Sequence, residues 1–162
     1  MDMTPIDMQK RRLFRQKSET IAENLMPWID SSERFIDRCT QCKQCLTQCP
    51  EHIIVMSSGG FPIIDFSLGE CTFCGQCAEQ CHEQIFNETN QLPWQKKAVI
   101  DDSCLANEQV YCRSCGESCL EEALSFQVGI TAVPTINLSA CNGCGACVAP
   151  CPTHAIAIKD VE

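Results

Sequence analysis

The sequence is poor in the large side chains that usually fill a protein interior. Only 6% of its 162 residues are aromatic, and 16 of the residues counted as apolar are cysteines. A chain of this size with so thin a conventional core needs a further source of stability. Bound metal is such a source, because its binding free energy becomes part of the folding free energy.

Long apolar runs are absent as well. No stretch approaches the roughly 18 apolar residues of a membrane span, so we expect no transmembrane helix. The paired Arg11 and Arg12 of "KRRLFRQK" are followed by "SETIAENLMPWID", where an export signal would have an apolar segment. We therefore expect a cytoplasmic protein. A secreted disulfide scaffold, which needs an oxidising compartment, is disfavoured.

Positive charge is scarce and unevenly placed. Residues 1–20 hold five Lys and Arg against three acidic residues, and the remainder holds seven against eighteen. The acidic body should repel nucleic acid and anionic membranes. The basic residues of the N-terminal segment are candidates for docking a partner: Lys10, Arg11, Arg12, Arg15 and Lys17. A disordered tail, or a helix laid on the acidic body, are the alternatives.

Motifs for nucleotide binding and catalysis are missing. There is no P-loop and no G-x-G-x-x-G, since "NGCGAC" has only the first half of that motif. His52, His82 and His154 each follow a cysteine run closely, without an evident base or nucleophile as partner. We expect a protein that is not an enzyme by itself.

Cysteine is what the chain has in excess, and it falls into four runs. Three of them, "CTQCKQCLTQCP", "CTFCGQCAEQCH" and "CNGCGACVAPCP", read C-x2-C-x2-C-x3-C. This is the ligand spacing of bacterial ferredoxins, which bind [4Fe-4S] clusters. Structural zinc sites instead bring paired cysteines together from separated stretches. His82 follows the second run where Pro50 and Pro152 follow two others, either as tolerated variation or as an influence on a cluster.

The remaining run, "CLANEQVYCRSCGESCL", has seven residues between its first two cysteines instead of two. "VIDDSC" precedes Cys104 as "SLGEC" precedes Cys71 and "NLSAC" precedes Cys141. We therefore interpret Cys104 as the first ligand of a working site with a bulged loop. The alternatives are a structural thiol at Cys104 beside an incomplete cluster, and dithiol chemistry by Cys112 and Cys115.

The spacing between runs predicts two tandem units. The last three cysteines of runs one and two are offset by 32 residues, as are those of runs three and four. We expect a basic arm, partly helical or disordered, over 1–35 and two bacterial-ferredoxin-like units over 36–92 and 98–160. Within each unit, "HIIVMSSGGFPIIDF" and "EALSFQVGITAVPTINL" predict two-stranded ribbons, and "QIF" and "HAIAI" predict closing strands. The fold class is α+β, with short helices and β-ribbons around four [4Fe-4S] clusters.

In this motif the fourth cysteine of a run ligates the other cluster of the pair, so each predicted ligand set draws on two runs. The sets are Cys39, Cys42, Cys45 and Cys81 for the first site; Cys71, Cys74, Cys77 and Cys49 for the second; Cys104, Cys112, Cys115 and Cys151 for the third; and Cys141, Cys144, Cys147 and Cys119 for the fourth.

The order of the runs, the expanded third run, the "SSGGFP" turn and the basic arm before "PWIDSSERFIDRC" together resemble the NapF family, the ferredoxin-type proteins of periplasmic nitrate reductase systems. The resemblance covers essentially the whole chain. It implies a cytoplasmic protein that contacts the catalytic nitrate reductase subunit before export and assists its maturation, by supplying or reducing an iron-sulfur centre. The alternatives are a plain electron-transfer polyferredoxin, or relay subunit of a larger oxidoreductase, and a non-redox structural metalloprotein.

Overall fold

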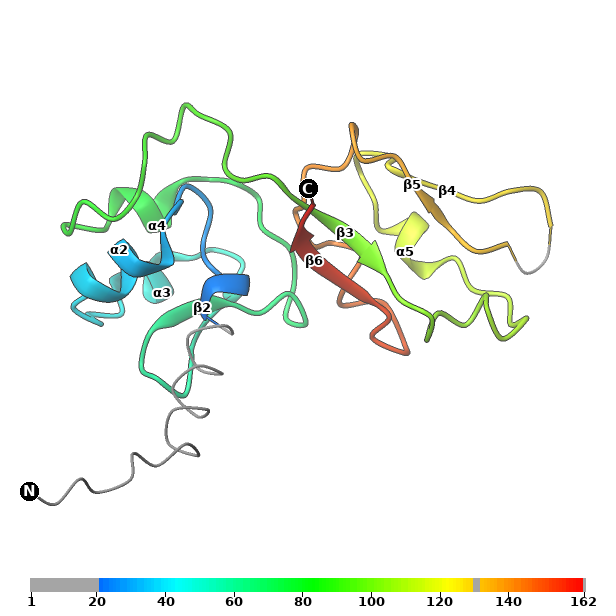
Figure 1. The fold of residues 1–162 in the computed structure, drawn as a ribbon, viewed down its shortest axis with the longest axis horizontal. Coiled ribbons are helices and arrows are strands. Elements are labelled where there is room, and N and C mark those ends of the chain that lie inside the picture. Colours follow the sequence, from blue (N-terminus) through cyan, green and yellow to red (C-terminus); the bar gives the residue numbers. More distant parts are fainter. Residues whose placement is uncertain (1–20, 130–131, 162) are drawn as a thin grey trace, which may run out of the picture.

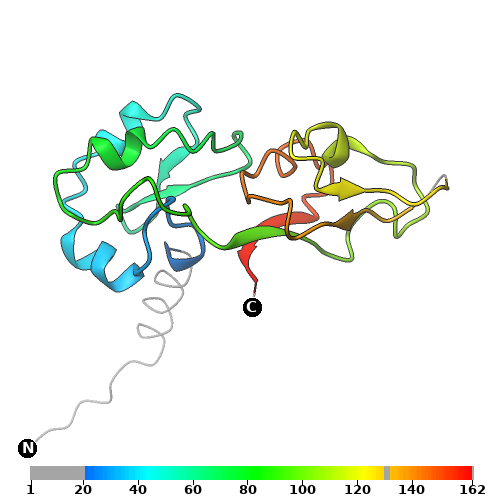
Figure 2. The same ribbon diagram turned by 90° about the horizontal axis from the view of Figure 1, so that it is seen from above.

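The structure is a computed structural model that describes residues 21–129 and 132–161. Figure 1 shows two lobes side by side along the long axis, and the view from above in Figure 2 agrees. We call residues 21–95 the first lobe and the described residues from 96 onward the second lobe. The regular structure of the described residues consists of short helices and three two-stranded antiparallel sheets, which is compatible with the predicted α+β class.

The first lobe contains a β-hairpin, a helical segment at residues 21–23 and three further short helices. Its elements are α2 (Ser32–Arg38), α3 (Gln44–Gln48), β1 (Ile54–Met56), β2 (Pro62–Ile64) and α4 (Gln76–Glu79). The hairpin pairs Ile54 with Ile64, and the N–H of Ser57 donates to the Phe61 carbonyl across the turn at 2.8 Å. Helix α2 begins after Ser31, whose hydroxyl accepts from the Arg34 N–H, so a side chain satisfies one of the free donors of its first turn.

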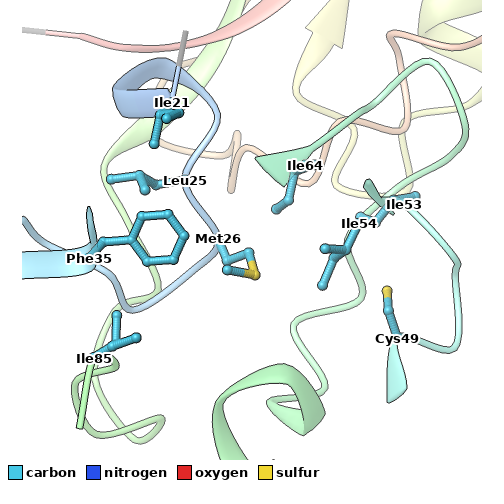
Figure 3. Close-up of a cluster of buried hydrophobic side chains, with 9 residues drawn as sticks. All are labelled: Ile21, Leu25, Met26, Phe35, Cys49, Ile53, Ile54, Ile64 and Ile85. Atoms are coloured by element: carbon cyan, nitrogen blue, oxygen red, sulfur yellow. The ribbon is translucent and has the colours of Figure 1, made fainter. Parts of the chain in front are cut away.

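A conventional hydrophobic cluster holds this lobe together. Figure 3 shows its buried side chains, which are Ile21, Leu25, Met26, Phe35, Cys49, Ile53, Ile54, Ile64 and Ile85. Phe35 and Met26 are each 1% exposed. Four of the nine residues precede the first cysteine run, so the described part of the segment expected as an arm contributes directly to the core. Residues 1–20, with the five basic docking candidates, lie outside the described residues.

The second lobe is organised by a strand pair that joins its two ends. Its elements are β3 (Lys96–Ile100), α5 (Ser114–Glu117), β4 (Leu124–Ser125), β5 (Thr135–Ile136) and β6 (Ile156–Asp160). Strand β6 is the closing strand predicted from "HAIAI". It pairs with β3 in a register that runs from Ile100↔Ile156 to Lys96↔Asp160. Strand β3 itself was not predicted; "KKAVI" spans residues 96–100, across the expected start of the unit at residue 98.

The closing strand predicted from "QIF" in the first lobe is wrong. Residues 84–86 form no strand, although Ile85 is 2% exposed. The segment that lies beside them is irregular: Trp28 has a φ of 62°, and its carbonyl accepts a single hydrogen bond from the Asn87 N–H at 2.7 Å. A left-handed residue interrupts the extended backbone that a ladder needs. Arg34 holds the segment instead, donating to the Ile85 carbonyl at 2.8 Å.

Candidate metal centres

The sixteen cysteines, all free thiols, line four separate cavities. The cavity linings contain Cys39, Cys42, Cys45 and Cys81; Cys49, Cys71, Cys74 and Cys77; Cys104, Cys112, Cys115 and Cys151; and Cys119, Cys141, Cys144 and Cys147. The structure thus brings together the same four groups that the repeat pattern predicts, each with three thiols from one run and one from another. The cavities are small and similar in volume, about 20 to 30 Å³ each.

Left-handed residues bend the runs around these cavities. Runs one, two and four each place two such residues between their first and third cysteines, and these are Gln41, Lys43, Phe73, Gly75, Gly143 and Gly145. A tight loop of this kind turns backbone N–H groups inward, which makes an anion-binding concavity. The backbone of Gln41 acts in this way to lower the pKa of Cys39, and that of Phe73 to lower the pKa of Cys71. This influence favours the thiolate.

Burial acts in the opposite direction and is the larger effect. It raises the pKa of Cys71, Cys77 and Cys147 to about 12, and that of Cys45 and Cys115 to about 11. Neighbouring thiols of the same cavity raise these pKa values further, because adjacent thiolates repel. Without metal the buried thiols are therefore protonated at neutral pH. Metal ligation requires thiolates, so binding releases these protons.

The second lobe adds backbone donors that the sequence did not reveal. The N–H of Ala123 lies 3.4 Å from Cys119 Sγ, that of Ala155 lies 3.3 Å from Cys151 Sγ, and that of Ala98 lies 3.5 Å from Cys141 Sγ. Ala98, Ala123 and Ala155 are each at most 4% exposed. Hydrogen bonds to the sulfurs are one of the means by which a protein sets cluster reduction potential.

The expanded third run folds as a compact turn. The Asn107 N–H donates to the Cys104 carbonyl at 2.9 Å, and the Val110 N–H donates to the Leu105 carbonyl at 3.0 Å. Ala106, in the middle of the turn, is 5% exposed. The extra residues therefore close on themselves and return the chain so that Cys112 lines the same cavity as Cys104.

The three histidines lie outside the cavities. His52, His82 and His154 are exposed, and none of them belongs to a cavity lining that contains cysteine. His52 and His154 have φ near 53°, and each stands three residues after the last cysteine of its run. Their observed role is in the left-handed turn by which the chain leaves the run.

The two inner cavities meet where the lobes meet. The N–H of Cys71, a second-site thiol, donates to the carbonyl of Cys144, a fourth-site residue, at 2.8 Å. Trp94 lies over the same junction: its Nε1 donates to the Asn142 carbonyl at 3.1 Å, and its ring contacts that of Phe73 edge-on at 5.5 Å. Cys45 of the first site is near enough to Cys77 of the second to raise its pKa, and Cys115 of the third site acts likewise on Cys147 of the fourth. The cavities therefore follow one another in the order first, second, fourth, third.

Two parts of the chain match known iron-sulfur domains. Residues 38–86 match the 4Fe-4S dicluster domain family, and residues 134–157 match the 4Fe-4S binding domain family. Together with the thiol-lined cavities, these matches define the class: this is a ferredoxin-type iron-sulfur protein. None of the helices in the described parts of the chain is long and apolar enough to cross a membrane.

Full-length relatives narrow the class to a family. The ferredoxin-type protein NapF of Haemophilus influenzae is 42% identical over 173 residues, which cover 99% of this chain and 98% of that protein. The ferredoxin-type protein NapF of Escherichia coli K12 is 34% identical over 154 residues, covering 93% of this chain and 94% of that protein. The chain belongs to the NapF family of ferredoxin-type proteins, as the motifs predicted.

Proposed function

We propose that this protein holds four [4Fe-4S] clusters, one in each thiol-lined cavity, with the sixteen cysteines as ligands in the predicted sets. The observation that carries the proposal is that four separate cavities are each lined by four thiols, three from one run and one from another. A single zinc ion binds sulfur at about 2.3 Å. Among residues 21–129 and 132–161, no three His, Cys, Asp or Glu side chains converge closely enough to hold one metal ion.

The residues present fit such a cluster in their chemistry. Each cavity offers four sulfur atoms, and N–H groups such as those of Ala123 and Ala155 point at the sulfurs. When bound, a [4Fe-4S] cluster supplies one-electron redox chemistry. The chain supplies thiolates, backbone donors to sulfur and an apolar surround that limits water.

We further propose that the protein acts in the cytoplasm on the catalytic subunit of periplasmic nitrate reductase before export, supplying or reducing its iron-sulfur centre. Support comes from the resemblance to NapF over essentially the whole chain. Cys42 of the first site and Cys74 of the second are exposed, while the other site thiols are at least partly buried. Exposed thiols at these two sites suit the transfer of iron to a partner. Within this proposal the basic residues 10–17 are candidates for docking the partner.

A second function, that of a plain electron relay, is favoured by a different observation. The contact between Cys71 and Cys144 links the inner cavities, so the four follow one another through the molecule. A continuous row of redox centres suits electron passage between two partners.

One experiment separates the two functions. Iron and acid-labile sulfide are counted per chain without oxygen, before and after incubation with cluster-free catalytic subunit. About sixteen of each at the start supports four clusters, and about twelve removes the third site. Iron that leaves this protein and is recovered in the partner identifies a donor. An unchanged count while electrons pass identifies a relay.

The ligand pairing is tested by Cys81→Ala. The first site, lined by Cys39, Cys42, Cys45 and Cys81, should lose its cluster, and the spectrum of the second should remain. A loss confined to the second site would contradict the cross-run pairing.

A further inference from the structure

The end of the second lobe that faces away from the first lobe carries several exposed apolar side chains. Tyr111 is 61% exposed, Val110 46% and Val128 107%. Figures 1 and 2 both place the loop after Cys104 and the β4–β5 hairpin at this end. We call the surface formed by Val110, Tyr111, Arg113, Phe126 and Val128 the distal patch.

Contacts between the two segments order the distal patch. The Arg113 guanidinium lies 5.6 Å from the centre of the Tyr111 ring and 5.1 Å from that of Phe126, which are cation–π distances. Arg113 also donates to the Gly129 carbonyl at 3.4 Å. The Phe126 ring packs on α5 against Gly116, leaving no room there for a larger residue. The third cysteine run and the hairpin are therefore tied together.

The inserted turn explains why this surface lies beside the third site. The turn is closed by its own hydrogen bonds between residues 104 and 110, and it delivers Val110 and Tyr111 to the surface directly before Cys112. Cys112 lines the third cavity, so the distal patch adjoins the wall of that site. The other three runs have two residues where this one has seven, and they present no such segment.

The surroundings of the distal patch are acidic. Asp102, Glu108 and Glu117 are exposed on the same loop and on α5. Arg113 is the sole Lys or Arg between residues 98 and 158, and it is already engaged by two rings and a carbonyl. An apolar centre with an acidic edge is complementary to a face with an apolar centre and a basic edge.

We propose that the distal patch is the docking surface for a protein whose contact face is apolar at its centre and carries lysine or arginine at its edge. The inserted turn of the third run builds this surface and sets the docked partner beside the third site. The claim that the partner takes iron-sulfur clusters or electrons there rests on the proposed function; the docking surface itself does not.

The first test measures binding of the cluster-loaded protein to cluster-free catalytic subunit of periplasmic nitrate reductase by biolayer interferometry. We expect Tyr111→Ser to raise the Kd at least tenfold, because tyrosine is among the residues that dominate interface energies. Val128→Ser should raise the Kd by a smaller factor, because it removes apolar contact area. Leu68→Ser and Leu92→Ser, which remove side chains 56% and 82% exposed in the first lobe, are the matched controls and should leave the Kd unchanged. Wild-type affinity in both patch variants would overturn the proposal.

Charge-reversal variants test whether the edge of the partner's contact face is positively charged. We expect Glu108→Lys and Glu117→Lys to weaken binding severalfold, and added salt to weaken wild-type binding, because the attraction is electrostatic. Glu88→Lys, at an exposed site of the first lobe, is the control with the same change in net charge. If all three reversals weaken binding equally, the distal patch has no special role. Visible absorbance and circular dichroism check that each variant is folded and loaded.

A second probe decides the matter if the wild-type protein does not bind the catalytic subunit. That result would overturn the proposed function, and the distal patch would then be tested with cytochrome c, a basic one-electron acceptor. Under the docking proposal, reduction of cytochrome c by the dithionite-reduced protein slows at least fivefold in Tyr111→Ser and not in Leu68→Ser. Equal rates in the two variants would overturn the docking surface as well.

Discussion

The two lobes hold similar sites by different means. The first lobe buries Phe35, Met26 and a group of isoleucines in a cluster to which one cysteine belongs. The cluster of the second lobe consists of two alanines, two isoleucines and three cysteines, which are Ala98, Ala155, Ile156, Ile158, Cys115, Cys147 and Cys151. The first lobe therefore has an apolar core beside its sites, whereas in the second lobe the site thiols form a large part of the core.

This difference indicates that the two lobes are stabilised by different interactions. Burial of large apolar side chains contributes about 1.5 to 3 kcal/mol each, and alanine contributes much less. The segment before the first cysteine run supplies Ile21, Leu25, Met26 and Phe35 to the first lobe. The second lobe has no equivalent segment within the described residues, so it depends more on whatever its thiols bind.

Removal of iron should have the largest effect on stability, and this effect should differ between the two lobes. After chelation without oxygen, we expect the amides of β3 and β6 to exchange hydrogen as in an unfolded chain, while α2 and the hairpin β1–β2 keep part of their protection. Metal binding is worth about 10 kcal/mol or more in small metal-dependent domains, and the second lobe has little apolar burial to replace it. Hydrogen exchange with mass spectrometry measures both lobes at once. Equal loss of protection would contradict the proposed difference.

Phe35→Ala should destabilise the first lobe and leave the second lobe unchanged. Phe35 is 1% exposed in the first-lobe cluster, so its truncation should lower the free energy of unfolding by about 3 to 5 kcal/mol. We expect guanidinium unfolding to show the first lobe melting earlier while the second lobe is unchanged. Leu124→Ala, at a half-buried position of the second lobe, is the control and should cost less. A loss shared by both lobes would mean that they unfold as one unit.

Gly145→Ala should loosen the junction of the lobes. Gly145 has a φ of +85°, and a Cβ there would overlap the Phe66 ring of the first lobe. Overpacking and a left-handed alanine together should cost about 2 to 4 kcal/mol. Gly129→Ala, where a Cβ meets nothing within 4 Å, is the matched control. Thermal melting and Trp94 fluorescence would report the change; a variant as stable as the control would show that Phe66 moves aside freely.

Asp30→Asn should have the smallest effect. The side chain of Asn87 and the Arg34 guanidinium, 3.1 Å away, lower the pKa of Asp30, but the carboxylate is 57% exposed. Its contribution should be below about 0.5 kcal/mol. A lowered pKa stabilises the fold above the ordinary value of 3.8 and loses this contribution only in acid. The difference from wild type should therefore be the same at pH 6 and pH 8 in urea unfolding; a change across that range would point to another titrating group.

The cysteine groups were predictable because the loop that surrounds a cluster fixes the spacing of the cysteines within a run. Three runs with C-x2-C-x2-C-x3-C spacing and two offsets of 32 residues predicted which thiols would meet, and the structure brings the same groups together. Strand β6 followed from an alternating apolar pattern. Strand β3 did not, because Lys96 is 6% exposed and reads as a surface residue until its Nζ is seen to donate to the Glu23 carbonyl and to pair with Asp160.

The sequence by itself was enough to predict the family and the four cysteine groups, since these follow from the spacing within and between the runs, and the acidic body, which follows from composition. Three contacts could be seen only in the tertiary structure. Residues from 21–35 pack into the first core, Cys71 contacts Cys144, and Arg113 joins Tyr111 to Phe126. These features depend on residues far apart in the chain. Their proximity is set by how whole segments pack, which no local pattern encodes.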